Sequence, residues 1–278
     1  MKNKGIIGAV CGDIIGSAYE FHSTKDMNFE LFTPKSRFTD DTVMTCAVAE
    51  WLITDPNHTH EELVKIMHRY GEKYPRCGFG GRFKKWLRQH KTEPYNSYGN
   101  GSAMRVSPVG YYAKTLEEAV QLAQISAEVT HNHPEGIKGA QAVAASIFIM
   151  RNSLQPSIGW DEIRDYLKKY CSYKMNYKQD EWEEHIQNYS FNVTCQGSVP
   201  EAVLCALEST DYEYCIRKAV SLGGDADTQA AIAGSIVAAC SPVPDHILNP
   251  CLELLDPPLV DVIDNFNDFI GQKSYLES

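Results

Sequence analysis

Apolar residues recur at intervals of three and four positions along most of this 278-residue chain, which is the spacing expected of helices with one buried face. The pattern predicts helices at residues 6–15, 43–52, 61–70, 116–129, 136–150, 160–170, 200–208, 212–222, 228–240 and 260–269. Thr115 precedes the fourth of these and Glu118 follows three residues later, which is the signature of a capping box. Apolar runs of period two are missing, so the sequence predicts an all-α fold.

Two stretches interrupt the helical pattern. Residues 75–81 are rich in turn-forming residues, and residues 173–195 are polar and aromatic without a clear period. The second stretch is expected either to run over the functional site or to form a poorly ordered loop. No stretch has the composition of a linker, so we expect residues 1–278 to form a single domain with one large core.

The composition is that of an ordinary globular protein, with 43% hydrophobic and 22% charged residues. The formal net charge of −10 argues against a nucleic-acid partner. The apolar segment after Lys4 imitates a short signal peptide, but Asp13 interrupts it, and no stretch reaches transmembrane length. The nine cysteines are scattered, with no Cys-x-x-Cys pair among them. We therefore expect free thiols, a cytoplasmic protein and no membrane partner.

Two acidic motifs dominate the sequence, and each stands directly before an apolar helical run. They are Thr39-Asp40-Asp41-Thr42 and Asp225-Ala226-Asp227-Thr228. Hard divalent cations bind carboxylate and hydroxyl oxygens, and without cations the carboxylates would repel one another if the motifs met. The motifs together therefore predict a two-metal site. For either motif alone, the competing explanation is a solvated helix start, where acidic residues are favoured.

Gly223 and Gly224 explain how the second motif could act as a ligand set. Inside a helix, carboxylates two residues apart point about 200° away from each other, so Asp225 and Asp227 could not share one metal there. In a glycine-rich loop that enters a helix they can converge. The alternative is a glycine C-cap followed by an acidic N-cap, although that needs only one Asp. The small residues after Thr228 should let this helix approach a neighbour closely and hold two distant ligand sets in register.

Asp13 and Glu20 lie seven residues apart, which places both acids on one face if the first helix continues that far. For Asp13, the alternative is pairing with an arginine or capping of a backbone group. Glu20 falls near the expected end of the helix, from which it could reach a metal-bound water as a general base.

A glycine-rich loop at residues 99–105, Gly-Asn-Gly-Ser-Ala-Met-Arg, stands before another helix candidate. Its backbone N–H groups would suit a phosphate or pyrophosphate, although an ordinary turn has the same composition. His131 and His133 lie between two predicted helices, and no third nitrogen or sulfur ligand accompanies them. We therefore expect His131 to hydrogen-bond a ligand rather than bind zinc, with a helix-capping role as the alternative.

Taken in order, these segments resemble the ADP-ribosylglycohydrolase family. The resemblance runs through residues 8–16, 39–42, 99–105, 130–131 and 223–228, and so spans nearly the whole chain. It implies a single-domain orthogonal helix bundle with a dinuclear metal cleft that holds two Mg2+, with Mn2+ as the alternative. The implied metal ligands are Thr39, Asp40, Asp41, Asp225, Asp227 and Thr228. The implied ligand-binding residues are Gly99, Asn100, Gly101, Ser102, Met104 and His131, and the implied catalytic residues are Glu20 and Asp41.

The resemblance also implies the reaction, which is metal-dependent release of ADP-ribose from a modified protein or a small ADP-ribosyl substrate. Ala226 replaces a Thr found in many members, and His133-Pro134-Glu135 departs from the serine-directed branch, so no acceptor linkage is carried over. Arginine, serine and small-molecule acceptors all stay open. Two other functions also stay open: a phosphoesterase that splits the pyrophosphate, and a binding protein without activity. Retention of Glu20 and of every implied metal ligand favours the hydrolase.

Overall fold

The computed structural model describes residues 5–209 and 211–276, and within these ranges its regular elements are all helices joined by loops. Its only extended pairing there is an isolated antiparallel bridge between Gly99 and Thr194. The first eight helices are α1 (Ile7–Gly16), α2 (Asp40–Thr54), α3 (His60–Lys73), α4 (Gly81–Arg88), α5 (Gly101–Met104), α6 (Ser107–Tyr112), α7 (Leu116–Glu128) and α8 (Pro134–Asn152). They are followed by α9 (Pro156–Tyr166), the π-helical turn η1 (Leu167–Cys171), α10 (Gln179–Asn188), α11 (Cys195–Leu207), α12 (Tyr212–Ser221), α13 (Ala226–Val237), α14 (Asp245–Leu254) and α15 (Pro257–Leu276). The all-α prediction is confirmed.

Each helix that the apolar period predicts is present. The sequence missed α4, α10 and α14, and it gave the helical region of α5 and α6 only as a candidate without bounds. Thr115 caps α7 as expected, because its hydroxyl accepts the backbone N–H of Glu118 at 3.0 Å. The Glu118 carboxylate reaches the backbone N–H of Lys114, one residue before the position that a capping box would give. The predicted start of α11 at residue 200 was wrong. The helix begins at Cys195, where the backbone N–H donates to Tyr98 O at 2.9 Å, so a tertiary contact fixes this end.

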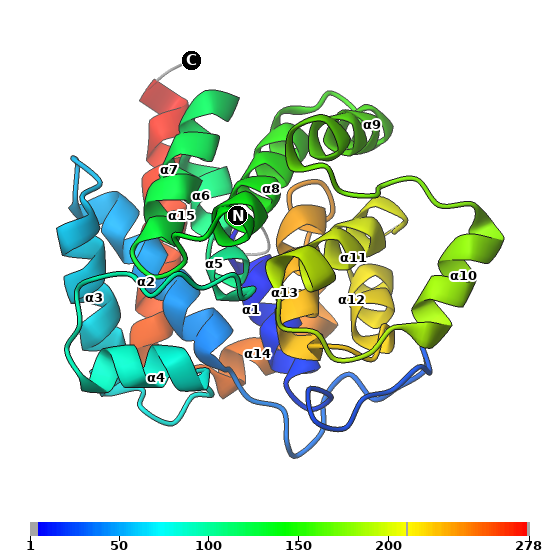
Figure 1. Cartoon of the computed structure of the whole chain (residues 1–278), viewed down its shortest axis with the longest axis horizontal. Coiled ribbons are helices and arrows are strands. Elements are labelled where there is room, and N and C mark those ends of the chain that lie inside the picture. The colour runs from blue at the N-terminus through cyan, green and yellow to red at the C-terminus, as the bar shows by residue number, and fades with distance from the viewer. Residues whose placement is uncertain (1–4, 210, 277–278) are drawn as a thin grey trace.

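Helices α1 and α13 form the centre of the molecule and make its most extensive helix pair (Figure 1). Glycines on α1 face the backbone of α13 with no room for a side chain. A Cβ atom on Gly12 would lie 2.2 Å from Ala230 O, and one on Gly16 would lie 2.4 Å from Ala226 O. The predicted close approach is therefore confirmed. Because α1 carries Asp13 and α13 begins at the second acidic motif, this packing sets the spacing of the carboxylates.

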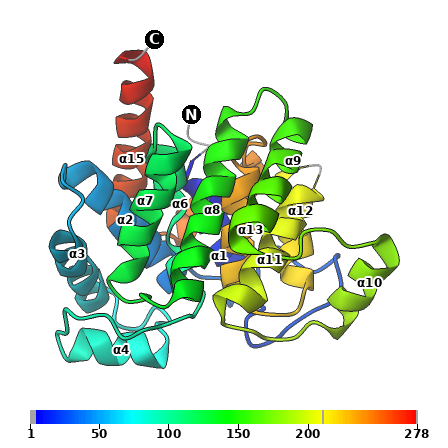
Figure 2. The same cartoon turned by 45° about the horizontal axis from the view of Figure 1, so that its top comes forward.

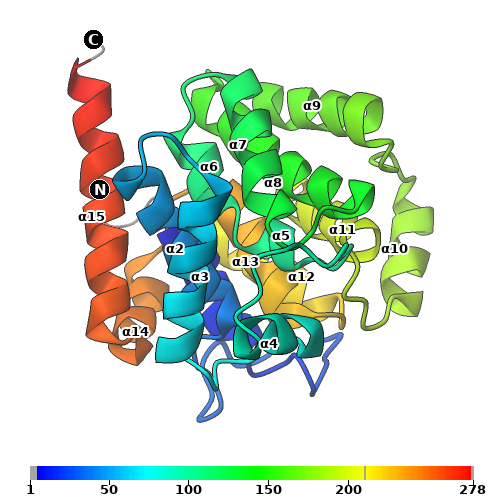
Figure 3. The ribbon, with the colours of Figure 1, turned by 60° about the vertical axis from the view of Figure 1, so that its left-hand side comes forward.

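The other helices pack around this pair over one hydrophobic core. Helix α15, near the C-terminal end of the described chain, packs along α2 (Figure 3). None of the helices in the described residues has the length and apolar character needed to cross a bilayer. All nine cysteines carry free thiols, as the sequence predicts, and eight of them are buried.

The stretch 173–195 leaves the core and returns beside the functional cleft. It carries α10 at the edge of the molecule (Figure 2) and then runs along the glycine-rich loop, where Asn100 N donates to Val193 O at 2.8 Å. Phe191 and Val193 line the cleft. Of the two expectations for this stretch, the structure therefore agrees with an excursion beside the site.

Candidate active site

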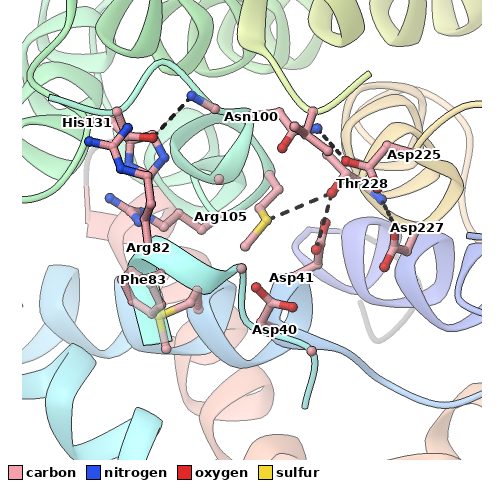
Figure 4. Close-up of a pocket in the computed structure, with 18 of the residues that line it drawn as sticks. Asp40, Asp41, Arg82, Phe83, Asn100, Arg105, His131, Asp225, Asp227 and Thr228 are labelled. Atoms are coloured by element: carbon pink, nitrogen blue, oxygen red, sulfur yellow. Dashed lines mark hydrogen bonds between the residues drawn. The ribbon is translucent and has the colours of Figure 1, made fainter. Parts of the chain in front are cut away.

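The two acidic motifs meet at the start of α2 and the start of α13. Thr39 caps α2 by accepting the backbone N–H of Asp41 at 3.3 Å, and Asp225 occupies the N-cap position of α13. Across the junction, the Thr228 hydroxyl donates to Asp41 Oδ2 at 3.4 Å. The motifs border one end of a cleft of about 310 Å³ (Figure 4). Asp40, Asp41, Asp225, Asp227 and Thr228 line this cleft, whereas Thr39 is buried behind Asp41.

Asp13 supports this end of the cleft from behind. Its fully buried carboxylate accepts the Thr39 hydroxyl at 2.7 Å, the Thr39 backbone N–H at 2.9 Å and the Thr42 backbone N–H at 3.1 Å. The Thr42 hydroxyl donates to the same carboxylate. The structure thus agrees with backbone capping, one of the two explanations open for Asp13, and shows that Asp13 fixes the first turn of α2.

The second motif converges in the way that its glycines suggest. Gly223 adopts a φ of +70°, and Asp225 then stands outside α13 while Asp227 lies in its first turn. One carboxylate oxygen from each of Glu20, Asp225 and Asp227 falls in a group whose members are all within 4.8 Å of one another. Asp13, Asp41 and Asp227 form a second group of this kind, so Asp227 joins the two.

The electrostatics of these carboxylates fit divalent cations. Burial, followed by repulsion from neighbouring carboxylates, raises the pKa of Asp40, Asp41 and Asp227 well above the ordinary value. Burial also raises the pKa of Asp225 to about 6, although a 2.7 Å hydrogen bond from Asn100 Nδ2 opposes this shift. Asp41 Oδ1 is buried with no hydrogen-bond partner. An orphaned carboxylate oxygen among crowded acids is the arrangement that a hard cation satisfies.

Glu20 lies beyond the end of α1, at the mouth of the cleft, and is only partly buried. The helix stops at Gly16, so Asp13 and Glu20 do not share a helix face, and the prediction based on seven-residue spacing was wrong. Tertiary structure brings Glu20 back to the carboxylates. Desolvation, followed by repulsion from Asp227, raises the pKa of Glu20 to about 7, which suits a group that must both accept and donate a proton near neutrality.

The other end of the cleft is lined by the glycine-rich loop and His131. Arg105 Nη2 donates to the Thr130 hydroxyl at 2.9 Å, and this hydroxyl lies 2.7 Å from His131 Nδ1. Since the hydroxyl accepts from the arginine, its own hydrogen is available for Nδ1, which leaves the proton of the neutral ring on Nε2. Burial holds the pKa of His131 well below its usual value. His131 Nε2 faces Gly101, since a Cβ atom added to Gly101 would lie 3.2 Å from this nitrogen.

The structure separates the ligand-binding residues that the resemblance implies. Gly99, Asn100, Gly101, Met104 and His131 line the cleft. The Ser102 side chain points away from it, because its hydroxyl donates to Gly136 O on α8 at 2.7 Å. Thr228 Oγ1 lies 3.9 Å from the Met104 sulfur, so Met104 brings the end of the glycine-rich stretch into contact with the acidic end of the site.

Sequence reasoning missed several residues that line the cleft. Arg82 and Phe83 stand at the start of α4, directly after the turn-rich residues 75–81, and Tyr95 lies beside them. The Arg82 guanidinium donates to Tyr95 O and sits 5.0 Å from the centre of the Tyr95 ring. Arg105 was already part of the expected glycine-rich loop; it is fully buried, and its Nε has no hydrogen-bond partner. The glycine-rich run Gly78-Phe79-Gly80-Gly81 directly before Arg82 was the one sequence feature that could have indicated a ligand-binding loop at this position.

Comparison with known proteins agrees with this geometry. A family model described as ADP-ribosylglycohydrolase matches residues 4–275. The chain belongs to the ADP-ribosylglycohydrolase family. Human ADP-ribosylhydrolase ARH3 is 28% identical to it, over 84% of this chain and 83% of its own length. ADP-ribosylarginine hydrolase Tri1 of Pseudomonas putida is 26% identical, over 95% of this chain and 80% of its own. The resemblance drawn from the five motifs is confirmed, and the protein is a glycohydrolase.

A solved structure confirms the fold of this ADP-ribosylglycohydrolase. An ADP-ribosylglycohydrolase-related protein complex contains a chain that superposes with a TM-score of 0.70 over 94% of both chains, at 18% identity. At this identity the superposition shows a shared fold, and the family itself is shown by the family model.

Proposed function

We propose that this glycohydrolase removes ADP-ribose from modified protein side chains and depends on two divalent cations, Mg2+ or Mn2+. One observation carries the proposal. A single cleft has a cluster of buried carboxylates, with Asp41 Oδ1 unpartnered, at one end and a glycine-rich loop beside His131 at the other. ADP-ribose has the matching polarity, because its ribose hydroxyls can approach cations while its diphosphate needs hydrogen-bond donors and positive charge.

The carboxylates of Asp40, Asp41, Asp225 and Asp227 are the residues that would hold the cations, with the hydroxyls of Thr39 and Thr228 beside them. Mg2+ and Mn2+ prefer oxygen ligands of this kind. When bound, such ions supply electrostatic stabilisation and lower the pKa of water. Asp13 and Asn100 help to keep these groups in place, because Asp13 accepts the backbone N–H of Thr39 and Asn100 donates to the Asp225 carboxylate.

Glu20 is the residue best placed to move the proton. Its carboxylate lies beside Asp225 and Asp227 at the cleft mouth, and its pKa of about 7 leaves a large ionised fraction at neutral pH. Glu20 takes a proton from the attacking water as the water oxygen bonds to the anomeric carbon. The bond from that carbon to the acceptor breaks, and the proton passes from Glu20 to the leaving group. The products are free ADP-ribose and the unmodified side chain.

The diphosphate would lie over the glycine-rich loop. His131 offers its Nε2 proton there, and the Arg105 charge lies beneath the loop with an unpartnered Nε. Burial lowers the pKa of Arg105 to about 10, so it stays charged at neutral pH. Arg82 adds a second cation at the open side. A buried donor without a partner is costly, and a phosphate oxygen would offset that cost.

The relatives bear on the acceptor. ARH3 is an ADP-ribosylhydrolase and Tri1 an ADP-ribosylarginine hydrolase, so an arginine acceptor is one specific candidate. The test is product analysis with purified protein on paired arginine-linked and serine-linked ADP-ribosyl peptides, in Mg2+ and in EDTA. Release of free ADP-ribose from one peptide, abolished by EDTA, is the expected result. Release of AMP would instead show a phosphoesterase, and binding of ADP-ribose without any release would show a non-catalytic protein.

A further inference from the structure

Three exposed apolar side chains lie at the mouth of the cleft. Phe21 directly follows Glu20, with Phe191 beside it, and Val193 borders the glycine-rich loop, where its carbonyl accepts the N–H of Asn100. Phe191 and Val193 line the cleft and are each 49% exposed. Phe21 is 74% exposed and has its ring centre 6.4 Å from that of Phe191. We call Phe21, Phe191 and Val193 the rim patch. Exposed apolar residues grouped beside a polar cleft, rather than scattered singly, indicate a surface that binds something.

Lys25 holds the two parts of the rim patch together. Its Nζ donates to Ile186 O at 2.6 Å and Tyr189 O at 2.8 Å, both at the end of α10, and to a third carbonyl at the end of α12. The loop that carries Phe21 is thereby tied to the stretch that carries Phe191, although the two are far apart in the sequence. Charge-assisted hydrogen bonds from Lys25 to backbone carbonyls therefore hold the segment of Phe21 next to the segment of Phe191.

The position of the rim patch matches the acceptor side of the substrate, if ADP-ribose binds as proposed above. The carboxylate of Glu20 groups with those of Asp225 and Asp227 within 4.8 Å, so the anomeric carbon would lie at this end. His131 and Arg82 lie on the opposite side of the cleft from Asp225 and Asp227, with Asn100 of the glycine-rich loop between them (Figure 4). Whatever the anomeric carbon carries must then leave the cleft past Phe21 and Phe191.

We propose that the rim patch binds the polypeptide that carries the ADP-ribosylated residue, by contact with an apolar or aromatic side chain next to that residue. This rests on the proposed function and deepens it, because it assigns the surface that binds the polypeptide beside the modified residue and the kind of neighbouring side chain that the surface prefers. A single ADP-ribosyl amino acid ends close to the scissile bond and leaves both rings in water. A polypeptide continues across them, and removal of apolar surface from water favours the longer substrate.

The experiment compares two substrates of the same linkage, with the full chain and Mg2+. One is an ADP-ribosylated peptide with Leu or Phe on both sides of the modified residue, and the other is the ADP-ribosylated single amino acid. The variants are Phe21→Ser, Phe191→Ser and the double variant. Leu154→Ser is the matched control, because Leu154 is 95% exposed and lies between α8 and α9, outside the residues that line the cleft.

In the double variant, the ratio of kcat/KM for the peptide to kcat/KM for the single amino acid should fall by about tenfold, an effect within the range found when aromatic residues that carry binding energy are truncated. Leu154→Ser should leave the ratio unchanged. An unchanged ratio in the double variant overturns the proposal, as does an equal fall of both values, which would mean a general structural defect. If the unmodified enzyme releases ADP-ribose from neither linkage in either form, the proposed function itself has failed.

Discussion

The Asp13 carboxylate on α1 accepts two hydrogen bonds from Thr39 at the start of α2, one from its hydroxyl at 2.7 Å and one from its backbone N–H at 2.9 Å. A fully buried carboxylate thus determines where the first acidic motif begins. Asp13 acts on the site from behind, through a residue that in turn caps Asp41. The relationship explains why an acid that does not line the cleft can still control its geometry.

Asp13→Asn should weaken both the fold and the cation site. The amide nitrogen cannot accept a hydrogen bond, so buried donors from Thr39 or Thr42 lose their partner, and the free energy of unfolding should fall by about 3 kcal/mol. Mg2+ affinity measured by calorimetry should fall as well. Asp55→Asn is the matched control, because Asp55 accepts two hydrogen bonds from Thr59 in the same manner, far along α2 from the cleft. It should lower stability without a change in Mg2+ affinity. Equal Mg2+ affinities of Asp13→Asn and the unmodified protein would contradict the positioning role.

Glu20→Gln should lower kcat by roughly 10²- to 10⁴-fold, because the amide can neither accept the proton of the attacking water nor return it. The four aspartates remain, so binding of ADP-ribose should change little. Glu30→Gln, an exposed acid in the same loop, serves as the control and should keep full turnover. Turnover of Glu20→Gln equal to that of the unmodified enzyme would remove Glu20 from the mechanism.

Mg2+ should raise the melting temperature more at pH 8 than at pH 5. In the cation-free protein, burial raises the pKa of Asp40, Asp41 and Asp227 above the ordinary value near 3.8, and that of Asp225 to about 6. The folded state therefore binds more protons than the unfolded chain above pH 4. Stability that these acids contribute at low pH is lost as the pH rises through their folded-state pKa values.

Bound cations replace those protons and remove the repulsion, so the stabilisation they bring grows with pH. Thermal unfolding followed at both pH values, with Mg2+ and with EDTA, measures this directly. A shift on Mg2+ addition that is the same at pH 5 and pH 8 would show that the carboxylates do not hold the cation.

Gly12→Ala should destabilise the protein strongly. The added Cβ would lie 2.2 Å from Ala230 O, so α1 and α13 must move apart, with an expected loss of about 3 kcal/mol in the free energy of unfolding. Gly81→Ala is the control, since its Cβ would meet no atom within 4 Å and its position also lies in a helix. Chemical denaturation of both variants is sufficient. A Gly12→Ala protein as stable as Gly81→Ala would contradict the close packing.

Arg82→Ala should raise KM for ADP-ribosyl substrates by roughly tenfold with little change in kcat, because a contact to the diphosphate is the same in the ground state and the transition state. Lys85→Ala, on the same helix but outside the cleft lining, is the control and should keep both constants. The effect of Arg82→Ala should also shrink at high salt. A fall in kcat with unchanged KM would assign Arg82 a different role.

Much of this protein could be predicted from the sequence. Helical periodicity is a local property of the chain, and it located the ten principal helices. The Thr-Asp-Asp-Thr and Asp-Ala-Asp-Thr motifs, with the small residues of α13, predicted a cluster of carboxylates held by closely packed helices. The seven-residue spacing of Asp13 and Glu20 gave a wrong prediction of a shared helix face. The helix α1 ends at Gly16, and no local signal showed how the chain continues.

What only the tertiary structure decided is the composition of the cleft. Tyr95 and the rim patch belong to loops without a helical period, and Arg82 begins the short helix α4 that the sequence analysis missed, so sequence spacing did not show where these side chains point. Their positions depend on contacts between segments far apart in the chain, such as those of Lys25 with the end of α10. The sequence by itself determined the secondary structure and the kind of chemistry, since both follow from residue type and local order. The cleft itself required the fold, because burial and long-range contacts alone bring its walls together.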